Sequence, residues 1–168
     1  MADLKKYTEY RTILSVNALI WADGKLLLLK RANNKELDPG TYSGIGGKVE
    51  PGEDFYSALL REIKEETGLT EFKSIRPYSV TQHPYPPTNA EWVSLYFIVE
   101  LEKRVKISAN EEGEFFWIDP KDINSLSMAT DTKDYIKILS KNPKAFILGF
   151  FDHDSSGKRT GKIKIKVL

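Results

Sequence analysis

The segment "GKVEPGEDFYSALLREIKEETGL", residues 47–69, is the most informative part of this chain for both its fold and its chemistry. Residues 54–67 include neither glycine nor proline, and Gly68 follows, so the sequence predicts a helix that ends there. Its apolar face is formed by residues at helical spacing, namely Phe55, Leu59, Leu60 and Ile63. We therefore expect this helix to pack one side against a core.

Three glutamates lie close together on the predicted helix. Glu62 and Glu66 are one turn apart with Glu65 beside them, and all three border the buried face, where solvent screens repulsion less. The preceding stretch "SGIGGK" places three glycines where the backbone takes unusual dihedral angles or approaches another group closely. One interpretation is a solvated helix face with basic neighbours as partners. The other, which also accounts for the glycines, is a site for a hard divalent cation such as Mg²⁺, which prefers oxygen ligands.

The composition limits the class of protein. A chain of 168 residues with 40% hydrophobic content fits one domain, residues 1–168, with a sizeable core. Its 25 basic and 24 acidic residues nearly cancel, which argues against duplex nucleic acid or an anionic membrane as partner. There is no apolar run of membrane-spanning length, no hydrophobic signal region and no cysteine. We expect a cytoplasmic protein whose chemistry uses carboxylates, lysine, arginine, histidine and hydroxyls.

The pattern outside the helix predicts a mixed α/β domain. Residues 12–21 and 25–30 are apolar runs separated by Asp23-Gly24, a strong hairpin signal. Further strands are expected at residues 71–80, 92–101, 114–118, 145–151 and 162–168, and a second helix within residues 131–143. The proline-rich segment 81–91 is expected to be a loop that cannot join a central ladder. The prediction is six or seven strands and two main helices.

Residues 47–69 also resemble the signature of the Nudix hydrolases. That signature is Gly, five residues, Glu, seven residues, Arg-Glu-aliphatic, one residue, Glu-Glu, one residue, Gly-aliphatic. The chain matches it at Gly47, Glu53, Arg61, Glu62, Ile63, Glu65, Glu66, Gly68 and Leu69. The resemblance implies the family's α/β/α sandwich, with a mixed sheet and a catalytic loop and helix. It also implies an enzyme in which water attacks a phosphorus in line while Mg²⁺ or Mn²⁺ neutralises the developing charge.

The resemblance assigns metal ligands by position. Glu62 and Glu66 are the main ligands, Glu65 assists them, and the carbonyl of Gly46 is a further ligand. Beyond the signature, Glu112 is chosen as an extra metal ligand or general base, because its distance before the tryptophan of "EFFWI" matches a glutamate of the MutT-type oxidised-purine nucleoside triphosphatases. A polar turn that enters a strand is the alternative interpretation of this residue.

Two other residues of the signature complete the predicted catalytic set. Arg61 holds Glu62 by a charge-assisted hydrogen bond, and Glu53 supports the loop or a water molecule on the metal.

Substrate contacts are expected from Arg31, Ser43, Gly46, Gly47, Lys48 and Asp131. Arg31 either meets substrate phosphates or is an exposed strand-end residue. Asp131 either reads the purine edge, as in the oxidised-purine branch, or caps the second helix. Ser43 stands where that branch has a base-contacting asparagine.

The favoured function is a Mg²⁺-dependent pyrophosphohydrolase that cleaves a nucleoside triphosphate, a purine nucleotide and oxidised forms included, to the monophosphate and pyrophosphate. The alternative is a hydrolase of ADP-ribose, another nucleoside diphosphate derivative or a dinucleoside polyphosphate. A non-catalytic nucleotide-binding module is less favoured. Such a module is free to lose the three glutamates of the signature, and this chain retains all of them. The expected partner is a nucleotide, without nucleic acid or membrane, and both a monomer and a homodimer remain open.

Overall fold

The computed structural model of the chain describes residues 10–35, 38–128 and 130–168. The elements follow one another in this order: β1 (Arg11–Ala22), β2 (Lys25–Arg31), β3 (Tyr42–Ser43), β4 (Ile45–Lys48), α1 (Phe55–Thr67), β5 (Ser74–Tyr85), η2 (Pro86–Thr88), β6 (Ala90–Glu100), β7 (Gly113–Ile118), η3 (Pro120–Ser125), α2 (Thr130–Lys141), β8 (Ile147–His153) and β9 (Arg159–Val167).

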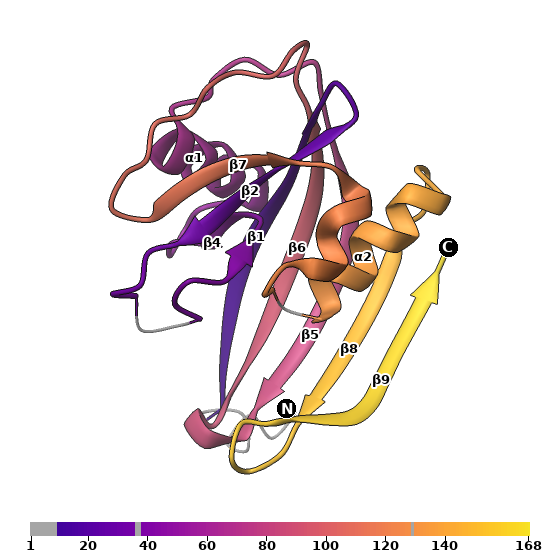
Figure 1. Cartoon of the computed structure of the whole chain (residues 1–168). Helices are drawn as coiled ribbons and strands as arrows, with labels where there is room; N and C mark the ends of the chain where they lie inside the picture. Colours follow the sequence, from indigo (N-terminus) through magenta and orange to yellow (C-terminus); the bar gives the residue numbers. More distant parts are fainter. Residues whose placement is uncertain (1–9, 36–37, 129) are drawn as a thin grey trace.

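The strands form one mixed sheet (Figure 1). Its order is β3-β2-β1-β6-β5-β8-β9, with β4 paired to β1 and β7 paired to β2. The β1–β6 and β5–β8 pairs are parallel and the remaining pairs are antiparallel. The expected hairpin is confirmed, because Ala22 lies opposite Lys25 across the turn. Asp23 and Gly24 have φ angles of 49° and 71°, which the twist of a two-residue hairpin favours.

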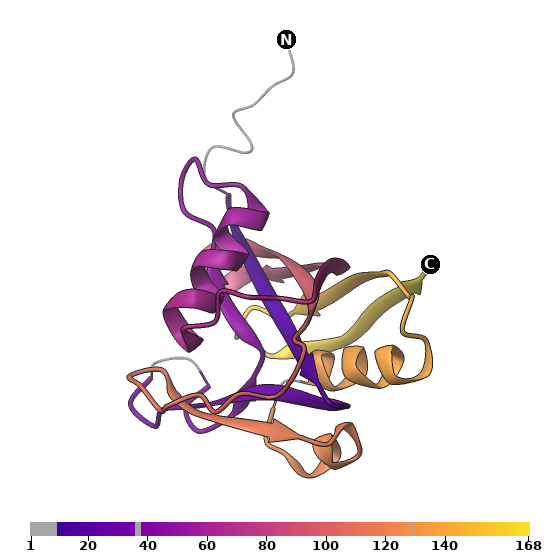
Figure 2. The ribbon, with the colours of Figure 1, turned by 90° about the horizontal axis from the view of Figure 1, so that it is seen from above.

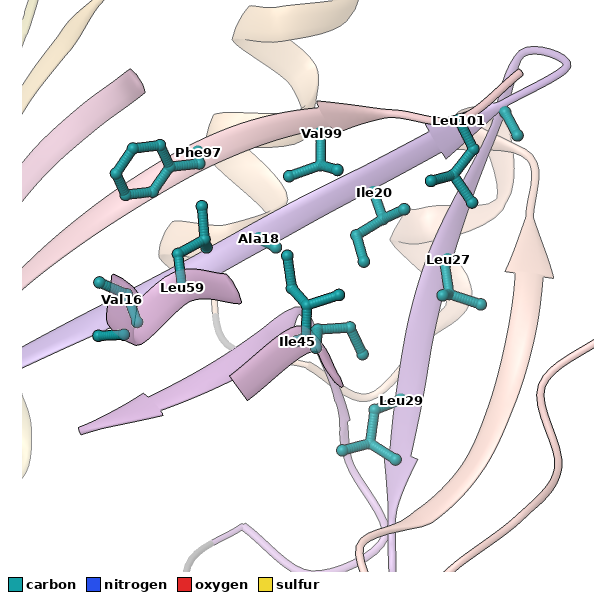
Figure 3. Close-up of a cluster of buried hydrophobic side chains, with 13 residues drawn as sticks. Val16, Ala18, Ile20, Leu27, Leu29, Ile45, Leu59, Phe97, Val99 and Leu101 are labelled. Atoms are coloured by element: carbon teal, nitrogen blue, oxygen red, sulfur yellow. The ribbon is translucent and has the colours of Figure 1, made fainter. Parts of the chain in front are cut away.

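The two helices cover opposite faces of this sheet, as Figure 2 shows. Alternation along β1 separates the two cores: Val16, Ala18 and Ile20 pack with α1, whereas Leu19 belongs to the cluster that contains α2. Figure 3 shows the first cluster, in which Leu59 of α1 lies over the strand side chains. The predicted α/β/α sandwich with a mixed sheet is confirmed.

The expectation that residues 81–91 form a loop is wrong for most of this segment, since only residues 86–89 form the turn between β5 and β6. Strand β5 continues to Tyr85 and pairs with β6 from Ser79 onward, including Pro84 opposite Glu91, beyond a bulge at Tyr78. The carbonyl of Pro84 accepts a hydrogen bond from Nδ1 of His153 at 3.0 Å, so the backbone of this proline faces away from β6. Its missing N–H therefore leaves no gap in the β5–β6 ladder. It leaves none in the β5–β8 ladder either, because β8 pairs with β5 only up to Gln82.

Within the described residues the sheet has nine strands rather than six or seven. The two short strands β3 and β4 lie in the glycine-containing segment, whose composition disfavours strands. Strand β4 forms because it pairs with β1, and this pairing is a tertiary interaction. The second helix begins at Thr130, so Asp131 lies in its first turn and not at the capping position. Among the described residues, none of the helices is long and apolar enough to cross a membrane.

Candidate active site

Helix α1 is held at both ends by local interactions. Asp54 is its N-cap, and Oδ1 of Asp54 accepts hydrogen bonds from the N–H groups of Tyr56 (2.9 Å) and Ser57 (3.0 Å). Hydrogen bonds from Ser57 keep the pKa of Asp54 below its ordinary value. Gly68 ends the helix in the left-handed conformation, with φ of 75°, as predicted. The caps set the start and end of the helix, and with them the positions of the glutamates along it.

Two glycines of β4 allow the sheet to approach these glutamates. Gly46 has φ of 151°, and a Cβ there would collide with the backbone of β1. A Cβ at Gly47 would collide with the carboxylate of Glu62. The N–H of Gly46 donates a hydrogen bond to Oε2 of Glu66 at 3.3 Å. The close backbone approach that the glycines predict is confirmed.

Arg61 connects the glutamates of α1 to the loop before the helix. Its Nε and Nη2 donate to the two carboxylate oxygens of Glu53 at 3.0 and 2.9 Å, a bidentate pair. Its Nη1 donates to Glu62 (2.8 Å) and to Glu65 (3.2 Å), and Nη2 also reaches the carbonyl of Lys48 at 3.0 Å. The hydrogen bonds from Arg61 lower the pKa of Glu53, and those to Glu53 and Glu62 raise the pKa of Arg61. One guanidinium thus holds three carboxylates in place.

Glu66 lies in a different environment, half-buried and without an ion-pair partner at contact distance among the described residues. Burial raises the pKa of Glu66 to about 8, and repulsion from Glu62 and Glu112 adds to the effect. The hydrogen bond from Gly46 and the charge of Arg31 act in the opposite direction. Burial also raises the pKa of Glu62. Negative charge at this pair is costly in the isolated protein, and a bound cation would relieve that cost.

The loop before β7 supplies the opposite wall. Oδ1 of Asn110 accepts a hydrogen bond from the N–H of Glu112 (2.9 Å), and Nδ2 of Asn110 donates to the carbonyl of Glu66 (2.7 Å). The carboxylate of Glu112 pairs with Lys35 at 2.8 Å. Asn110 was not predicted from the sequence, although an asparagine that bonds its own backbone two residues on is a known turn former. It attaches the Glu112 loop directly to the end of α1.

These walls enclose a cleft of about 970 Å³, which we call the acidic cleft. Its lining is Arg31, Gly46, Gly47, Lys48, Glu62, Glu65, Glu66, Asn110, Glu111 and Glu112. Most of the predicted site residues therefore come together. Glu53 and Arg61 do not line the cleft and support it through the contacts given above. Ser43 lies in β3 opposite Leu29 and is not part of the lining, and the side chain of Asp131 is outside the described residues.

The oxygen-rich lining fits a hard divalent cation in its donor chemistry. Among the described residues, no three histidine, aspartate or glutamate side chains are gathered at ligand distance. Glu65 is 61% exposed, and the carboxylate of Glu112 is bonded to Lys35. Glu62 is also bonded to Arg61, through Oε1, but its side chain is only 14% exposed. This leaves Glu62 and Glu66 as the pair best placed to hold an ion. Mg²⁺ uses one or two carboxylates and completes its coordination with waters and phosphates, so such a pair is sufficient.

Known proteins have sequences related to most of this chain. The model of the NUDIX domain matches residues 11–139. An "ADP-ribose pyrophosphatase" of Methanocaldococcus jannaschii is 38% identical over 141 residues, which are 80% of this chain and 78% of that protein. The "Nucleoside triphosphatase NudI" of Escherichia coli K12 is 36% identical over 141 residues, which are 76% of this chain and 95% of the relative.

Solved structures show the same architecture. The MutT protein of Bacillus halodurans matches with a TM-score of 0.74 at 21% identity, covering 92% of this chain and 97% of that one, which is a likeness of fold alone. The MutT protein of Methanosarcina mazei Go1 matches with a TM-score of 0.64 at 28% identity, over 81% and 98% of the two chains. The family model covers well over half of the chain, including the glutamates and glycines that line the acidic cleft and Arg61, which supports them. The chain therefore belongs to the Nudix hydrolase family.

Proposed function

We propose that the protein is a Mg²⁺-dependent pyrophosphohydrolase that converts a nucleoside triphosphate and water into a nucleoside monophosphate and pyrophosphate. The supporting observation is the half-buried pair Glu62 and Glu66 beside two glycines of β4, in a cleft of nucleotide size. Nudix hydrolases generally use divalent metals. When bound, Mg²⁺, or Mn²⁺ in its place, would neutralise the negative charge that develops on the phosphate oxygens.

In this proposal the residues of α1 divide into ligands and supports. Glu62 and Glu66 hold the ion, Glu65 assists, and the carbonyl of Gly46 is a further ligand. Arg61 keeps the Glu62 carboxylate oriented and anchors Glu53, whose Oε2 also accepts from the N–H of Glu50 at 3.1 Å. The loop before the helix is thereby tied to the carboxylates, which preorganises the site before substrate arrives.

The remaining lining residues are assigned to the substrate and to the attacking water. Arg31 and Lys48 supply positive charge at the cleft and bind the phosphates. Glu112, on the wall opposite α1, accepts the proton of the water or acts as an additional metal ligand. Water attacks a phosphorus in line, the bridge between the α and β phosphates breaks, and the monophosphate and pyrophosphate are released. Ser43 and Asp131 remain proposed contacts to the base.

Hydrolysis of ADP-ribose is the second candidate function. The observation that favours it is the M. jannaschii relative, whose printed name is ADP-ribose pyrophosphatase and which is 38% identical over most of this chain. The same cleft suits both reactions, because each cleaves a diphosphate bridge with water. The two differ only in the group attached beyond the bridge, so products distinguish them directly.

A substrate panel tests the proposal. The purified chain is incubated with MgCl₂ and, separately, normal and oxidised purine and pyrimidine triphosphates, ADP-ribose and diadenosine tetraphosphate, and products are separated by anion-exchange chromatography. We expect a monophosphate and pyrophosphate from at least one triphosphate, at a kcat/KM above that for ADP-ribose. Release of AMP and ribose phosphate with the higher kcat/KM would replace the first candidate by the second. Binding of nucleotides without any turnover would leave only a non-catalytic module.

A further inference from the structure

A second cavity of about 830 Å³ lies apart from the acidic cleft, and the two share no lining residue. It is bounded by the β1–β2 turn, the start of β5, the end of β6, η3 and the last turn of α2. Of these elements, α2 lies on the other side of the strands from α1 (Figure 1). The cavity is thus separate from the acidic cleft, and the proposed hydrolysis does not use its residues.

The floor of this cavity is apolar. Ile98, Leu101, Ile123 and Leu139 line it, and each of them is at most 7% exposed and belongs to one of the two cores. Trp21 forms part of the wall, with a flat aromatic surface. Such a floor favours a ligand with an apolar or aromatic body, because burial of that body removes apolar surface from water.

The rim is positively charged, and we call this feature the lysine-rimmed cavity. Its cations come from separate elements: Lys73, Arg76, Lys121, Lys137 and Lys141. The guanidinium of Arg76 donates to the carbonyl of Pro143 and lies over the ring of Tyr78. For the four lysine ammonium groups, the described part of the chain shows neither an ion pair nor a hydrogen bond.

The acidic residues of the lining are engaged by other groups. Asp23 forms an ion pair at 3.1 Å with Arg104, a residue outside the cavity lining. The carboxylate of Glu100 accepts from Oγ of Ser74 at 3.1 Å. Oδ1 of Asp119 accepts from the N–H of Lys121 at 3.0 Å, where it caps η3. The rim therefore presents an excess of positive charge over an apolar floor.

Trp21 provides an independent observation. Its indole Nε1–H is buried and has no hydrogen-bond acceptor within the part of the chain that the structure describes. Buried donors are paired in most proteins, and an unpaired donor beside a cavity is explained when a ligand supplies the acceptor. The same ligand would have to carry negative charge to match the rim.

We infer that the lysine-rimmed cavity is a second ligand site, specific for a small organic anion that joins a flat apolar body to a phosphate, sulfonate or carboxylate group. The body lies on the apolar floor, and the oxygens of the anionic group accept from the indole N–H of Trp21 and meet the lysines of η3 and α2. This inference is independent of the proposed hydrolysis, since none of these residues lines the acidic cleft.

The three tryptophans of the chain allow a site-resolved test. Trp21 lines the lysine-rimmed cavity, Trp92 lies 5.7 Å from the ammonium of Lys48 beside the acidic cleft, and Trp117 donates to the carbonyl of Val105 at 2.8 Å. We would titrate the full chain without metal with 1-anilinonaphthalene-8-sulfonate, an aromatic sulfonate, and follow the three indole N–H signals by ¹H–¹⁵N NMR. Trp21→Phe and Trp92→Phe assign the signals. The expected result is a saturable shift of the Trp21 signal and none of the Trp92 signal.

Matched variants separate a built site from general charge attraction. Lys121→Glu combined with Lys137→Glu should weaken the binding at least about tenfold, because two exposed rim cations are reversed without disturbing the core. Lys166→Glu with Lys164→Glu, on β9, changes the net charge equally and should alter the affinity less than about twofold. Inorganic pyrophosphate, which lacks an apolar body, should shift the Trp21 signal far more weakly.

Three outcomes would overturn the inference. They are no shift of the Trp21 signal at millimolar probe, an equal shift of the Trp92 signal, or an equal loss of affinity in the β9 control. Because the experiment uses neither metal nor turnover, its failure leaves the proposed hydrolysis untouched. A failure of the substrate panel would likewise leave this site in place.

Discussion

The acidic cleft and the lysine-rimmed cavity are of similar volume, about 970 and 830 Å³, but they are built in opposite ways. Most of the acidic cleft comes from strand β4 and helix α1, within residues 46–66, so its carboxylates have a spacing that sequence can reveal. The lysine-rimmed cavity is assembled from residues between Trp21 and Pro143, none of which forms a motif.

The two cavities also differ in the charge of their side chains and in how these side chains are paired. In the acidic cleft, Arg61 bonds three carboxylates, and Glu66 is left half-buried with a pKa of about 8. In the lysine-rimmed cavity, the acids are engaged by neighbouring groups, and the four lysine ammonium groups have neither an ion pair nor a hydrogen bond within the described part of the chain. One site is therefore prepared for a cation and the other for an anion, within the same nearly neutral chain.

The largest effect is expected from Glu66→Gln. We expect kcat/KM to fall about a thousandfold, because loss of a metal ligand removes several kcal/mol of transition-state stabilisation and each ~1.4 kcal/mol is tenfold. Steady-state assays with Mg²⁺ measure it, and Glu71→Gln, an exposed residue beyond the helix, is the control. Activity within about threefold of the wild type would show that Glu66 is not a ligand.

Arg61→Lys is expected to lower kcat/KM by about 10- to 100-fold, the usual range for residues that orient metal ligands. Lysine keeps the charge but cannot form the bidentate bond to Glu53 while also reaching Glu62. Apparent metal affinity should fall in parallel while the thermal midpoint changes little. Lys64→Arg, on the exposed side of α1, is the control. Unchanged metal affinity would place Arg61 outside the support of the ligands.

Metal affinity should depend on pH through Glu66. Below its pKa of about 8 this carboxyl is protonated, so a metal must displace the proton, and affinity should rise about tenfold per unit as the pH increases toward 8. Calorimetric titration with Mn²⁺ between pH 6 and 9 (roughly the range on either side of that pKa) measures the slope, which Glu66→Gln should abolish.

Stability provides a check on the sign of this effect. The pKa of Glu66 is raised above its ordinary value in the folded state, so its protonation stabilises the fold at low pH. Without metal, that stabilisation is lost as the pH rises from about 4.5 to about 8. Wild type should therefore lose thermal stability relative to Glu66→Gln over this range. A difference that is independent of pH would contradict the raised pKa.

A smaller effect is expected from Asn110→Asp, which keeps the acceptor for the N–H of Glu112 but replaces the donor to the carbonyl of Glu66. The variant should lose about 1 kcal/mol of stability, the usual net value of one hydrogen bond, and reduce kcat only several-fold. Thermal unfolding and steady-state kinetics measure the two quantities. Asn110→Ala removes both contacts without adding charge, and wild-type stability and kcat in this variant would show that the Glu112 loop does not depend on α1.

The smallest effect is expected from Lys121→Glu with Lys137→Glu on hydrolysis. These residues share no partner with the acidic cleft, so kcat/KM without added effector should stay within about twofold. Arg31→Glu, inside the acidic cleft, should by contrast reduce turnover strongly. A large loss in the lysine variant would show that the two cavities are coupled.

Much of the architecture could be predicted from local patterns. The Asp23-Gly24 hairpin, the end of α1 at Gly68 and the last two strands follow from turn chemistry, capping and alternation, which act over a few residues. The proline-rich segment was mispredicted. Pro84 is tolerated because its backbone faces away from β6, at a point where β8 no longer pairs with β5, and this depends on strands that lie far along the chain. The strand β4 was missed for the same reason, since two of its four residues are glycines that pair only because β1 is adjacent.

Local sequence was sufficient for helix α1, its end at Gly68 and the spacing of Glu62, Glu65 and Glu66, because these depend on hydrogen bonds and periodicity within a few turns of chain. Only the tertiary structure decided which carboxylate is left without an arginine partner. Arg61 reaches Glu53, Glu62 and Glu65, while β4 and the Asn110 loop bury Glu66. The desolvation that raises its pKa arises from segments distant in sequence, so no local pattern can encode it.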